Sequence, residues 1–376
     1  MKSEKVIVVG AGVAGLSLAI MLAEQGIESV VLDARERFDG PTSGVRISAE
    51  GVELLRLMKM DPIGENTERV DMRFGRVSAS FPARQSNCPA IIVTRLALHE
   101  QLMKCARALG IRVVTDFKVV AISESVDRVE AASPSRETVS GTVLVGADGV
   151  GSTVRRFLNS EQGSKKIYAG YLGVGLLAAD EEKTEMTLHR YPGHEVGVAS
   201  CGRVNAAATR NSIFMWTHIH LSERDARLAT KASVEGELAK RAEGWRPELA
   251  RKYDIYREDV DATLAFGPIY NGTPPGRWYS NRMMLIGDAA HPYGPGGQGI
   301  SMALKDAKGL CGVIVRGFSE SDKAEFRQRR GREARALGEA AERRNAKVPS
   351  STTLGLMLEG VFMKTLGLLA PGAMRL

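Results

Sequence analysis

Three glycines near the amino terminus constrain the fold of this chain more than any other feature. Gly10, Gly12 and Gly15 follow a short β-branched run and open a helical pattern. In such a unit the first glycine permits a tight turn, the second lets a pyrophosphate approach the backbone, and the third packs the helix closely. Asp33 ends the next apolar run, at residues 29–32, where it can accept from ribose hydroxyls. The chain therefore opens with a βαβ unit that binds a dinucleotide.

Composition narrows the classes of partner. With 376 residues and 44% hydrophobic content the chain can bury more than one core, and its net charge of +7 is mild. No run of like charges resembles a nucleic-acid tail, so small anions are the expected partners rather than nucleic acid. The four cysteines are scattered, which argues against a disulfide framework or a metal site and favours a reducing cytoplasm.

The amino terminus also has features of a signal peptide or a membrane span. Lys2 and Lys5 precede an uncharged stretch. The glycine pattern would be lost if that stretch were cleaved or buried in lipid. We therefore expect a cytoplasmic protein with no membrane span, beginning at Met1.

A second loop follows the apolar strand predicted at residues 143–145. It reads Gly146-Ala147-Asp148-Gly149, with Ser152 and Arg155 shortly after. An ordinary strand-to-helix turn capped by Asp or Ser explains it as well as a carboxylate that meets a cofactor at the edge of a sheet. Both interpretations stay open on this loop alone.

The third loop, at residues 287–299, is the most specific. Asp288 ends a strand, where it can bond ribityl hydroxyls, and His291 and Pro292 follow. Gly296, Gly297 and Gly299 clear side chains from a place where a flat ring lies against backbone N–H groups. The helix that begins there points its positive end at the ring and would stabilise a negative charge on a reduced flavin.

The three loops together, in this order and spacing, resemble the single-component (class A) flavoprotein aromatic hydroxylases of the p-hydroxybenzoate hydroxylase fold. The resemblance runs from residue 6 to about residue 344 and includes Val93-Thr94-Arg95-x-x-Leu98. Departures are Asp33-Ala34-Arg35 in place of the more usual Glu-Arg, and a loop around Arg46 that differs from many relatives. The predicted FAD contacts are Gly10, Gly12, Ala14, Gly15, Asp33, Ala34, Arg35, Arg46, Arg95, Asp148, Gly149, Asp288, Pro295, Gly297, Gln298 and Gly299.

The fold expected is α/β, with a discontinuous Rossmann-like FAD-binding domain of the GR2 type. Its predicted segments are 1–70, 88–165 and 276–345. A mainly antiparallel sheet at 71–87 plus 166–275 forms the substrate-binding domain, and 346–376 is a C-terminal helical segment. Within these, we predict an irregular stretch at 38–51, one strand at 73–81 and one charged helix at 223–243.

The resemblance also implies a reaction. NAD(P)H reduces the flavin, O2 gives a flavin C4a-hydroperoxide, and one oxygen atom enters an aromatic, heteroaromatic or natural-product substrate, as in secondary metabolism. Hydroxylation, epoxidation and Baeyer-Villiger insertion stay open, as do an FAD-dependent reductase, a halogenase and a flavoprotein that only sequesters a ligand.

The residues that act on the substrate are expected on the sheet in the middle third of the chain. His218, on a polar and aromatic face of the strand at residues 211–220, is a candidate base, although a solvent-side histidine is the stronger interpretation. Arg190 and Arg210 are candidates to orient an anionic or phenolic substrate, against ordinary surface positions. No metal is expected, because His218 and His220 lack a third ligand. The apolar stretch at 352–369 favours packing on the substrate domain, or on the second subunit of a homodimer, over a membrane.

Overall fold

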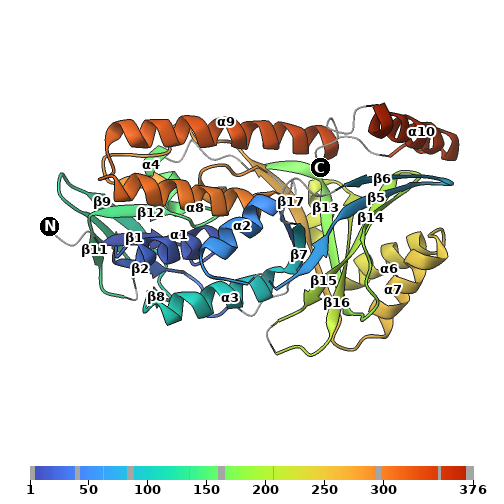
Figure 1. Ribbon diagram of the computed structural model, residues 1–376, viewed down its shortest axis with the longest axis horizontal. Helices are drawn as coiled ribbons and strands as arrows, with labels where there is room; N and C mark the ends of the chain where they lie inside the picture. The colour runs from blue at the N-terminus through green and yellow to red at the C-terminus, as the bar shows by residue number, and fades with distance from the viewer. Residues whose placement is uncertain are drawn as a thin grey trace.

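The computed structural model describes residues 5–38, 43–61, 63–82, 89–134, 136–159, 166–205, 207–293, 298–345 and 349–369. Two large sheets, each covered by helices, lie at opposite ends of the long axis (Figure 1). The long helix α9 runs along one side, and the last helix, α10, lies beside the second sheet (Figure 1).

The first large sheet has five strands, in the order β18-β12-β1-β2-β8. Each of its four neighbouring pairs is parallel. Continuous apolar runs form these strands because helices bury both faces of a parallel sheet. The strands are β1 (Val6–Val9), β2 (Ser29–Leu32), β8 (Arg112–Val114), β12 (Val143–Gly146) and β18 (Met283–Leu285). The surrounding helices are α1 (Val13–Glu24), α2 (Ala49–Leu57), α3 (Arg95–Ala108), α4 (Thr153–Asn159), α8 (Gly299–Val315) and α9 (Glu320–Asn345), with the 3-10 turn η2 (Gly287–Ala289).

Two small sheets accompany the five-stranded one. The first has the order β11-β10-β9, and its strands are β9 (Ala121–Glu124), β10 (Val129–Ala132) and β11 (Val139–Gly141). The second has the order β3-β7-β4, and its strands are β3 (Gly44–Ile47), β4 (Glu65–Thr67) and β7 (Ala90–Thr94). This second small sheet packs against the large sheet at the other end of the molecule through β7 and β15.

The second large sheet has seven strands, in the order β17-β13-β16-β15-β14-β5-β6. Its pairs are antiparallel except for β14 with β5. The strands are β5 (Arg69–Phe74), β6 (Val77–Pro82), β13 (Lys166–Ala179), β14 (Met186–Tyr191), β15 (His194–Arg203), β16 (Asn211–His220) and β17 (Thr263–Gly272). Helices α5 (Glu223–Leu228), α6 (Lys231–Ala242) and α7 (Pro247–Glu258) follow β16, and α6 and α7 lie on the face of the sheet away from α1 and α8 (Figure 1).

Helix α10 (Thr353–Leu369) packs on β5, β6 and β14. Leu356 is buried there, and Gly360 comes so close that an added Cβ would lie 2.8 Å from the Cβ of Phe74. Packing of this segment on the seven-stranded sheet is therefore as expected from its apolar composition. None of the described helices combines the length and the apolarity needed to cross a bilayer.

Three local predictions were wrong. The strand predicted at 73–81 is a hairpin, because Gly75 at φ +54° turns the chain between β5 and β6. The helix predicted at 223–243 is interrupted after α5, and Thr230 caps a new helix by accepting from the Ser233 N–H. The stretch predicted as irregular at 38–51 contains β3 and the start of α2, whose pairing with β7 is a tertiary contact that local sequence does not reveal.

Candidate functional site

Three loops lie side by side at the carboxyl edge of the five-stranded sheet. Strands β1, β12 and β18 are neighbours and parallel, so the residues that follow them leave the sheet at the same edge. A Cβ on Gly10 would lie 2.4 Å from the carbonyl oxygen of Ala147, and a Cβ on Gly287 would lie 3.0 Å from the Cβ of Ala14. The glycines thus let three segments, far apart in the chain, meet at van der Waals distance.

Two helices, α1 and α8, begin at this edge. The N-cap of α1 is Gly12 and the N-cap of α8 is Gln298, and neither terminus has a side-chain cap. A Cβ on Gly12 would meet nothing within 4 Å, whereas one on Gly15 would lie 1.9 Å from the carbonyl oxygen of Gly10. Gly15 is therefore required for packing, and Gly12 leaves open space in front of a positive helix end, which fits an anion such as a pyrophosphate.

Asp33 fixes the first loop. Its Oδ2 accepts from the Ala11 N–H at 2.7 Å, and Arg35 binds the carboxylate through its backbone N–H and guanidinium at 2.9 Å. Burial alone would raise the pKa of the Asp33 carboxyl, but the hydrogen bonds from Arg35 and Ala11 outweigh it and lower the pKa. All four lone-pair sites of the carboxylate are then occupied. A ribose hydroxyl bound by Asp33 would have to displace Arg35, which is exposed beside Ala34.

His99 supports the same loop, and sequence reasoning missed it. Its Nε2 lies 2.8 Å from the carbonyl oxygen of Ala11, and Phe38 packs on its ring at 4.5 Å between centroids. Burial lowers the pKa of His99, so the neutral ring donates from Nε2 to Ala11. The signal in the sequence was weak, because His99 sits one turn into α3 on an otherwise ordinary helix.

Asp148 has the capping role that the sequence left open. Its carboxylate accepts from the Ser152 hydroxyl at 2.5 Å and from the Thr153 N–H at 2.6 Å at the start of α4. Gly149 turns the chain at φ +75°. Burial raises the pKa of Asp148 against these hydrogen bonds.

Arg155 joins the second loop to the third. Its Nη1 donates to the carbonyl oxygens of Asp288 at 3.0 Å and Ala289 at 2.9 Å, and its Nη2 donates to Val150. The side chain is 1% exposed. Because one rigid guanidinium holds both loops, their relative position is fixed before any ligand binds.

Asp288 is the carboxylate that stays open. Its side chain is exposed, and it receives no hydrogen bond from the part of the chain that the structure describes. Crowding by surrounding protein nevertheless raises the pKa of this carboxyl, against the attraction of His291 and Arg95. An accessible acceptor between two uncapped helix ends fits a polar group such as a ribityl chain.

A buried ionic cluster stands behind Asp288 and was also missed. Asp306 in α8 is fully buried and accepts from His291 at 2.6 Å, from Arg330 at 2.6 Å and from the Gly287 N–H at 2.8 Å. Burial opposes the charge on Asp306, but His291 and Arg330 outweigh it and lower its pKa. The signal was a lone acid within an apolar helix. The cluster ties η2 to both α8 and α9.

The structure also shows where other residues predicted to contact FAD lie. Arg95 begins α3 with an exposed side chain, near enough to Asp288 to attract its charge. Arg46 is half-buried on β3, opposite Ile92. Gly299 is the first residue of α8, and a Cβ added to it would lie 4.0 Å from Oδ1 of Asp288. Pro295 and Gly297 lie outside the described residues.

Comparison with known proteins decides the family. The model of the FAD binding domain family matches residues 3–345. The chain belongs to this family. It is 25% identical over 326 residues to 3-amino-4-hydroxybenzoate 2-monooxygenase PtmB3 of Streptomyces platensis, covering 82% of this chain and 79% of that one. It is 29% identical over 338 residues to kynurenine 3-monooxygenase of Salinispora arenicola, covering 81% and 71%.

The fold also matches that of solved structures. The structure of Klebsiella pneumoniae HpxO complexed with FAD and uric acid superposes with a TM-score of 0.81 at 22% identity, covering 99% of this chain and 96% of that one. The predicted family, α/β fold class, FAD cofactor and enzyme class of FAD-dependent monooxygenase are confirmed.

In this member of the FAD-binding family the three candidate catalytic residues lie in the seven-stranded sheet or directly before one of its strands. His218 is half-buried on β16 and packs on the Tyr171 ring at 4.3 Å between centroids. Arg190 on β14 is bound to Glu195 at 2.8 Å and to Glu359 of α10 at 3.4 Å. Arg210 is exposed just before β16. Among the described residues, no group of three His, Cys, Asp or Glu could hold a metal ion.

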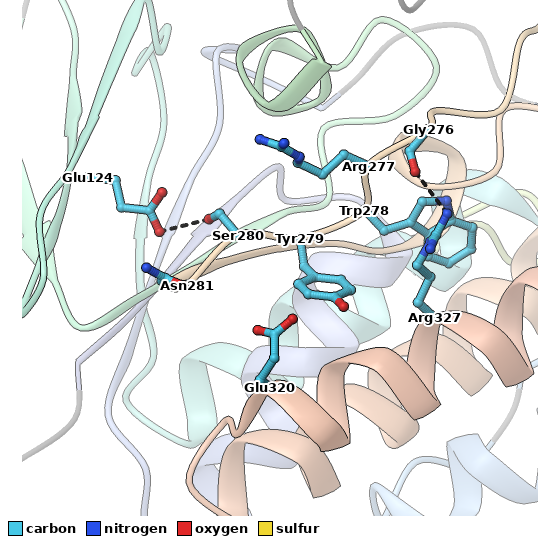
Figure 2. A pocket seen from close by; sticks show the side chains of 9 residues that line it. All are labelled: Glu124, Gly276, Arg277, Trp278, Tyr279, Ser280, Asn281, Glu320 and Arg327. Atoms are coloured by element: carbon cyan, nitrogen blue, oxygen red, sulfur yellow. Dashed lines mark hydrogen bonds between the residues drawn. The ribbon is translucent and has the colours of Figure 1, made fainter.

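A separate hollow of about 550 Å3 is lined by the residues that Figure 2 shows. The segment 276–281, which precedes β18, forms much of its lining, so it lies at the amino end of that strand, opposite the edge used by the loops. Ser280 donates to Glu124 at 2.7 Å, and Arg327 donates to the Gly276 carbonyl oxygen at 2.9 Å. These polar groups bind one another, and the hollow is no part of the candidate site.

Proposed function

We propose that this enzyme uses NAD(P)H and O2 to insert one oxygen atom into an aromatic, heteroaromatic or related natural-product substrate. The observation that carries the proposal is the meeting of the loops at Gly10, Asp148 and Asp288 at one sheet edge. Relatives named for 3-amino-4-hydroxybenzoate and kynurenine support an aromatic substrate.

The residues of the three loops have separable roles in this proposal. Gly12 and the uncapped start of α1 hold the pyrophosphate, and Asp288 accepts from the ribityl chain. The uncapped start of α8, at Gln298 and Gly299, would offer N–H donors and a positive helix end to the flavin ring. Bound FAD supplies electron transfer from the nicotinamide and activation of O2. Arg155 and Asp306 hold the loops in their positions relative to one another.

The sheet supplies the substrate side. His218 faces the same side of β16 as Trp216, and we retain it as the group that accepts a proton from a phenolic substrate. Arg190 is a poorer candidate for an anionic substrate, because two carboxylates already engage it. Arg210 stays a candidate to orient an anionic or phenolic substrate, and its exposed position also fits an ordinary surface residue.

A single methyl group tests the cofactor site. Gly12→Ala meets no protein atom within 4 Å, so we expect a stably folded protein whose FAD affinity falls by roughly tenfold or more, because the methyl occupies the phosphate's place. The matched control is Gly236→Ala in α6, where a Cβ also meets nothing. Fluorescence titration with FAD measures both. Unchanged affinity in Gly12→Ala would contradict the proposed site.

Oxygen insertion is tested on the holoenzyme with 18O2. Mass spectrometry of products from a panel of phenols, hydroxylated heteroaromatics and polycyclic natural products should show one labelled oxygen atom with NADH or NADPH as reductant. Substrate-stimulated NAD(P)H oxidation without label in any product would favour a reductase. Intact FAD binding without turnover would favour a sequestering protein.

Three further proposals concern organisation. We retain the predicted domain segments, with the seven-stranded sheet as the substrate-binding unit.

The free thiols of Cys105, Cys201 and Cys311 support a reducing, cytoplasmic setting. The outer side of α10 exposes Leu354 and Phe362 by 68% and 65%, which supports a homodimer, and light scattering of the purified protein tests it.

A further inference from the structure

Ala11 lies between the first two glycines of the first loop, and side chains from two other parts of the chain bind its backbone. Its N–H donates to Oδ2 of Asp33 at 2.7 Å, and its carbonyl oxygen accepts from Nε2 of His99 at 2.8 Å. Asp33 directly follows β2, and His99 belongs to α3. The two peptide groups on either side of the Ala11 Cα are therefore each held in one orientation by a side chain.

The direction of the Ala11 carbonyl fixes the direction of the next N–H group. The peptide bond between Ala11 and Gly12 is trans and planar, so its C=O and N–H point to opposite sides. Because the carbonyl points at His99, the Gly12 N–H points away from that ring. Within the described part of the chain this N–H has no acceptor, and a Cβ on Gly12 would meet nothing within 4 Å. A free donor thus stands beside open space at the start of α1.

The His99 ring is itself held in place by its neighbours. It packs on Phe38 at 4.5 Å between centroids, and the Arg35 guanidinium lies 4.4 Å from the centroid of the same Phe38 ring. Arg35 in turn binds the Asp33 carboxylate at 2.9 Å. These four side chains form a closed circuit around Ala11. The orientation of the peptide is therefore set before a ligand binds, which reduces the entropy lost on binding.

A purely structural role, in which His99 only joins α3 to the loop, is the alternative. Apolar contacts already dock this helix, because Leu98, Leu102 and Ala106 are buried in the core. Without His99, water could satisfy the Ala11 carbonyl, since this loop lies at the open edge of the sheet. The particular effect of the histidine is to give that carbonyl a single direction.

We infer that His99 is a positioning residue for FAD: by holding the Ala11 carbonyl, it aims the Gly12 N–H at the pyrophosphate of the cofactor. The inference rests on the proposed function, which places the pyrophosphate at the start of α1. A hydrogen bond to a charged phosphate oxygen is roughly twice as strong as one between neutral groups, so the aim of this single donor matters for affinity. His99 acts through the loop and has no need to touch the cofactor.

The test compares two variants of similar size that differ in one donor. His99→Gln keeps an amide N–H near the position of Nε2, whereas His99→Met has no donor there. We expect His99→Met to lower FAD affinity roughly fivefold to thirtyfold and His99→Gln to lower it by less than about threefold. Fluorescence titration with FAD measures both. Lys104→Met, at an exposed position of the same helix, is the matched control and should bind FAD as the wild type does.

Phosphorus NMR of the FAD-saturated proteins separates positioning from stability. Loss of a donor changes the surroundings of the pyrophosphate, so its signals should shift in His99→Met and return toward the wild-type positions in His99→Gln. The flavin absorbance spectrum should stay unchanged in both, because the ring contacts are not altered. His99→Asn, whose amide is too short to reach Ala11, repeats the loss of the donor if the methionine variant does not fold.

Two results would overturn the inference. One is wild-type affinity and wild-type phosphorus signals in His99→Met or His99→Asn, and the other is an equal loss of affinity in His99→Gln and His99→Met. Gly12→Ala separates this failure from that of the proposed function. Full FAD affinity in Gly12→Ala counts against the pyrophosphate site itself, whereas a weakened Gly12→Ala beside an unaffected His99→Met counts against the role of His99 alone.

Discussion

The two faces that meet around the candidate site are held in place by different means. On the FAD-binding side, buried ionic and hydrogen-bonding groups fix each loop, as Arg155 and Asp306 show. On the substrate side, glycines and stacked rings fix the position of Trp216. Members of a family that bind the same cofactor need the same hydrogen-bond donors and acceptors for it. A substrate surface must differ between members that use different substrates. Single substitutions change the volume of side chains on such a surface. The difference predicts where mutations act on stability and where they act on selectivity.

The largest effect should come from the buried cluster. Asp306→Asn leaves His291 without its buried counter-charge and leaves Arg330 with Glu333 alone, which should lower the free energy of unfolding by about 3–5 kcal/mol. Urea denaturation measures it. Glu325→Gln, on the exposed face of α9, is the matched control and should change stability by less than about 0.5 kcal/mol. Equal effects of the two variants would mean that the buried ionic cluster stabilises the fold no more than an exposed charge does.

A smaller effect is expected where the loops are joined. Arg155→Met loses the donors to the Asp288 and Ala289 carbonyls, so FAD affinity should fall roughly tenfold to a hundredfold. Fluorescence titration with FAD measures the loss. Arg156→Met changes a neighbouring exposed arginine and should bind FAD as the wild type does. An Arg155→Met protein with normal FAD affinity would show that the loops hold their register without the guanidinium.

The same cluster predicts a dependence of stability on pH. Burial opposes protonation of His291, but Asp306 outweighs it and raises the pKa of His291 above the ordinary 6.5. The protonated ring therefore contributes stability that is complete below pH 6.5 and is lost as the pH rises through the folded pKa. The free energy of unfolding should fall over that range in the wild type and stay flatter in His291→Gln. A parallel pH profile in the two proteins would contradict this.

The smallest effect should come from the ion pair between the sheet and α10. Glu359→Gln weakens a contact of 3.4 Å with Arg190 on partly exposed side chains, so stability should fall by less than about 1 kcal/mol. Thermal unfolding measures it. Gly360→Val, which would drive a side chain into Phe74, should be clearly more damaging. The reverse order would mean that charge, rather than packing, holds this helix.

Sequence reasoning correctly brought the three glycine-bearing loops together, because the signals for them are local. Gly10, Asp148 and Asp288 each follow an apolar strand, and parallel strands release such residues at a common edge. It missed His99, whose partner Ala11 is 88 residues away, and Asp306, whose pairs with His291 and Arg330 depend on how η2, α8 and α9 pack. The alternation of residues predicted that Trp216 lies on a polar and aromatic face of its strand. That Gly175 and Gly197 lie opposite Trp216 follows only from the register of the neighbouring strands, which alternation alone does not fix.

The parallel pairing of β5 with β14 sets an order of events during synthesis. Met72 aligns with Leu188, and Val6 aligns with Val143, so each of these early strands has one neighbour that is synthesised much later. The nascent hairpin β5–β6 must stay available on the ribosome without pairing elsewhere, and such long-range closures are slow. Shortened fragments of this chain should aggregate where the full-length polypeptide folds.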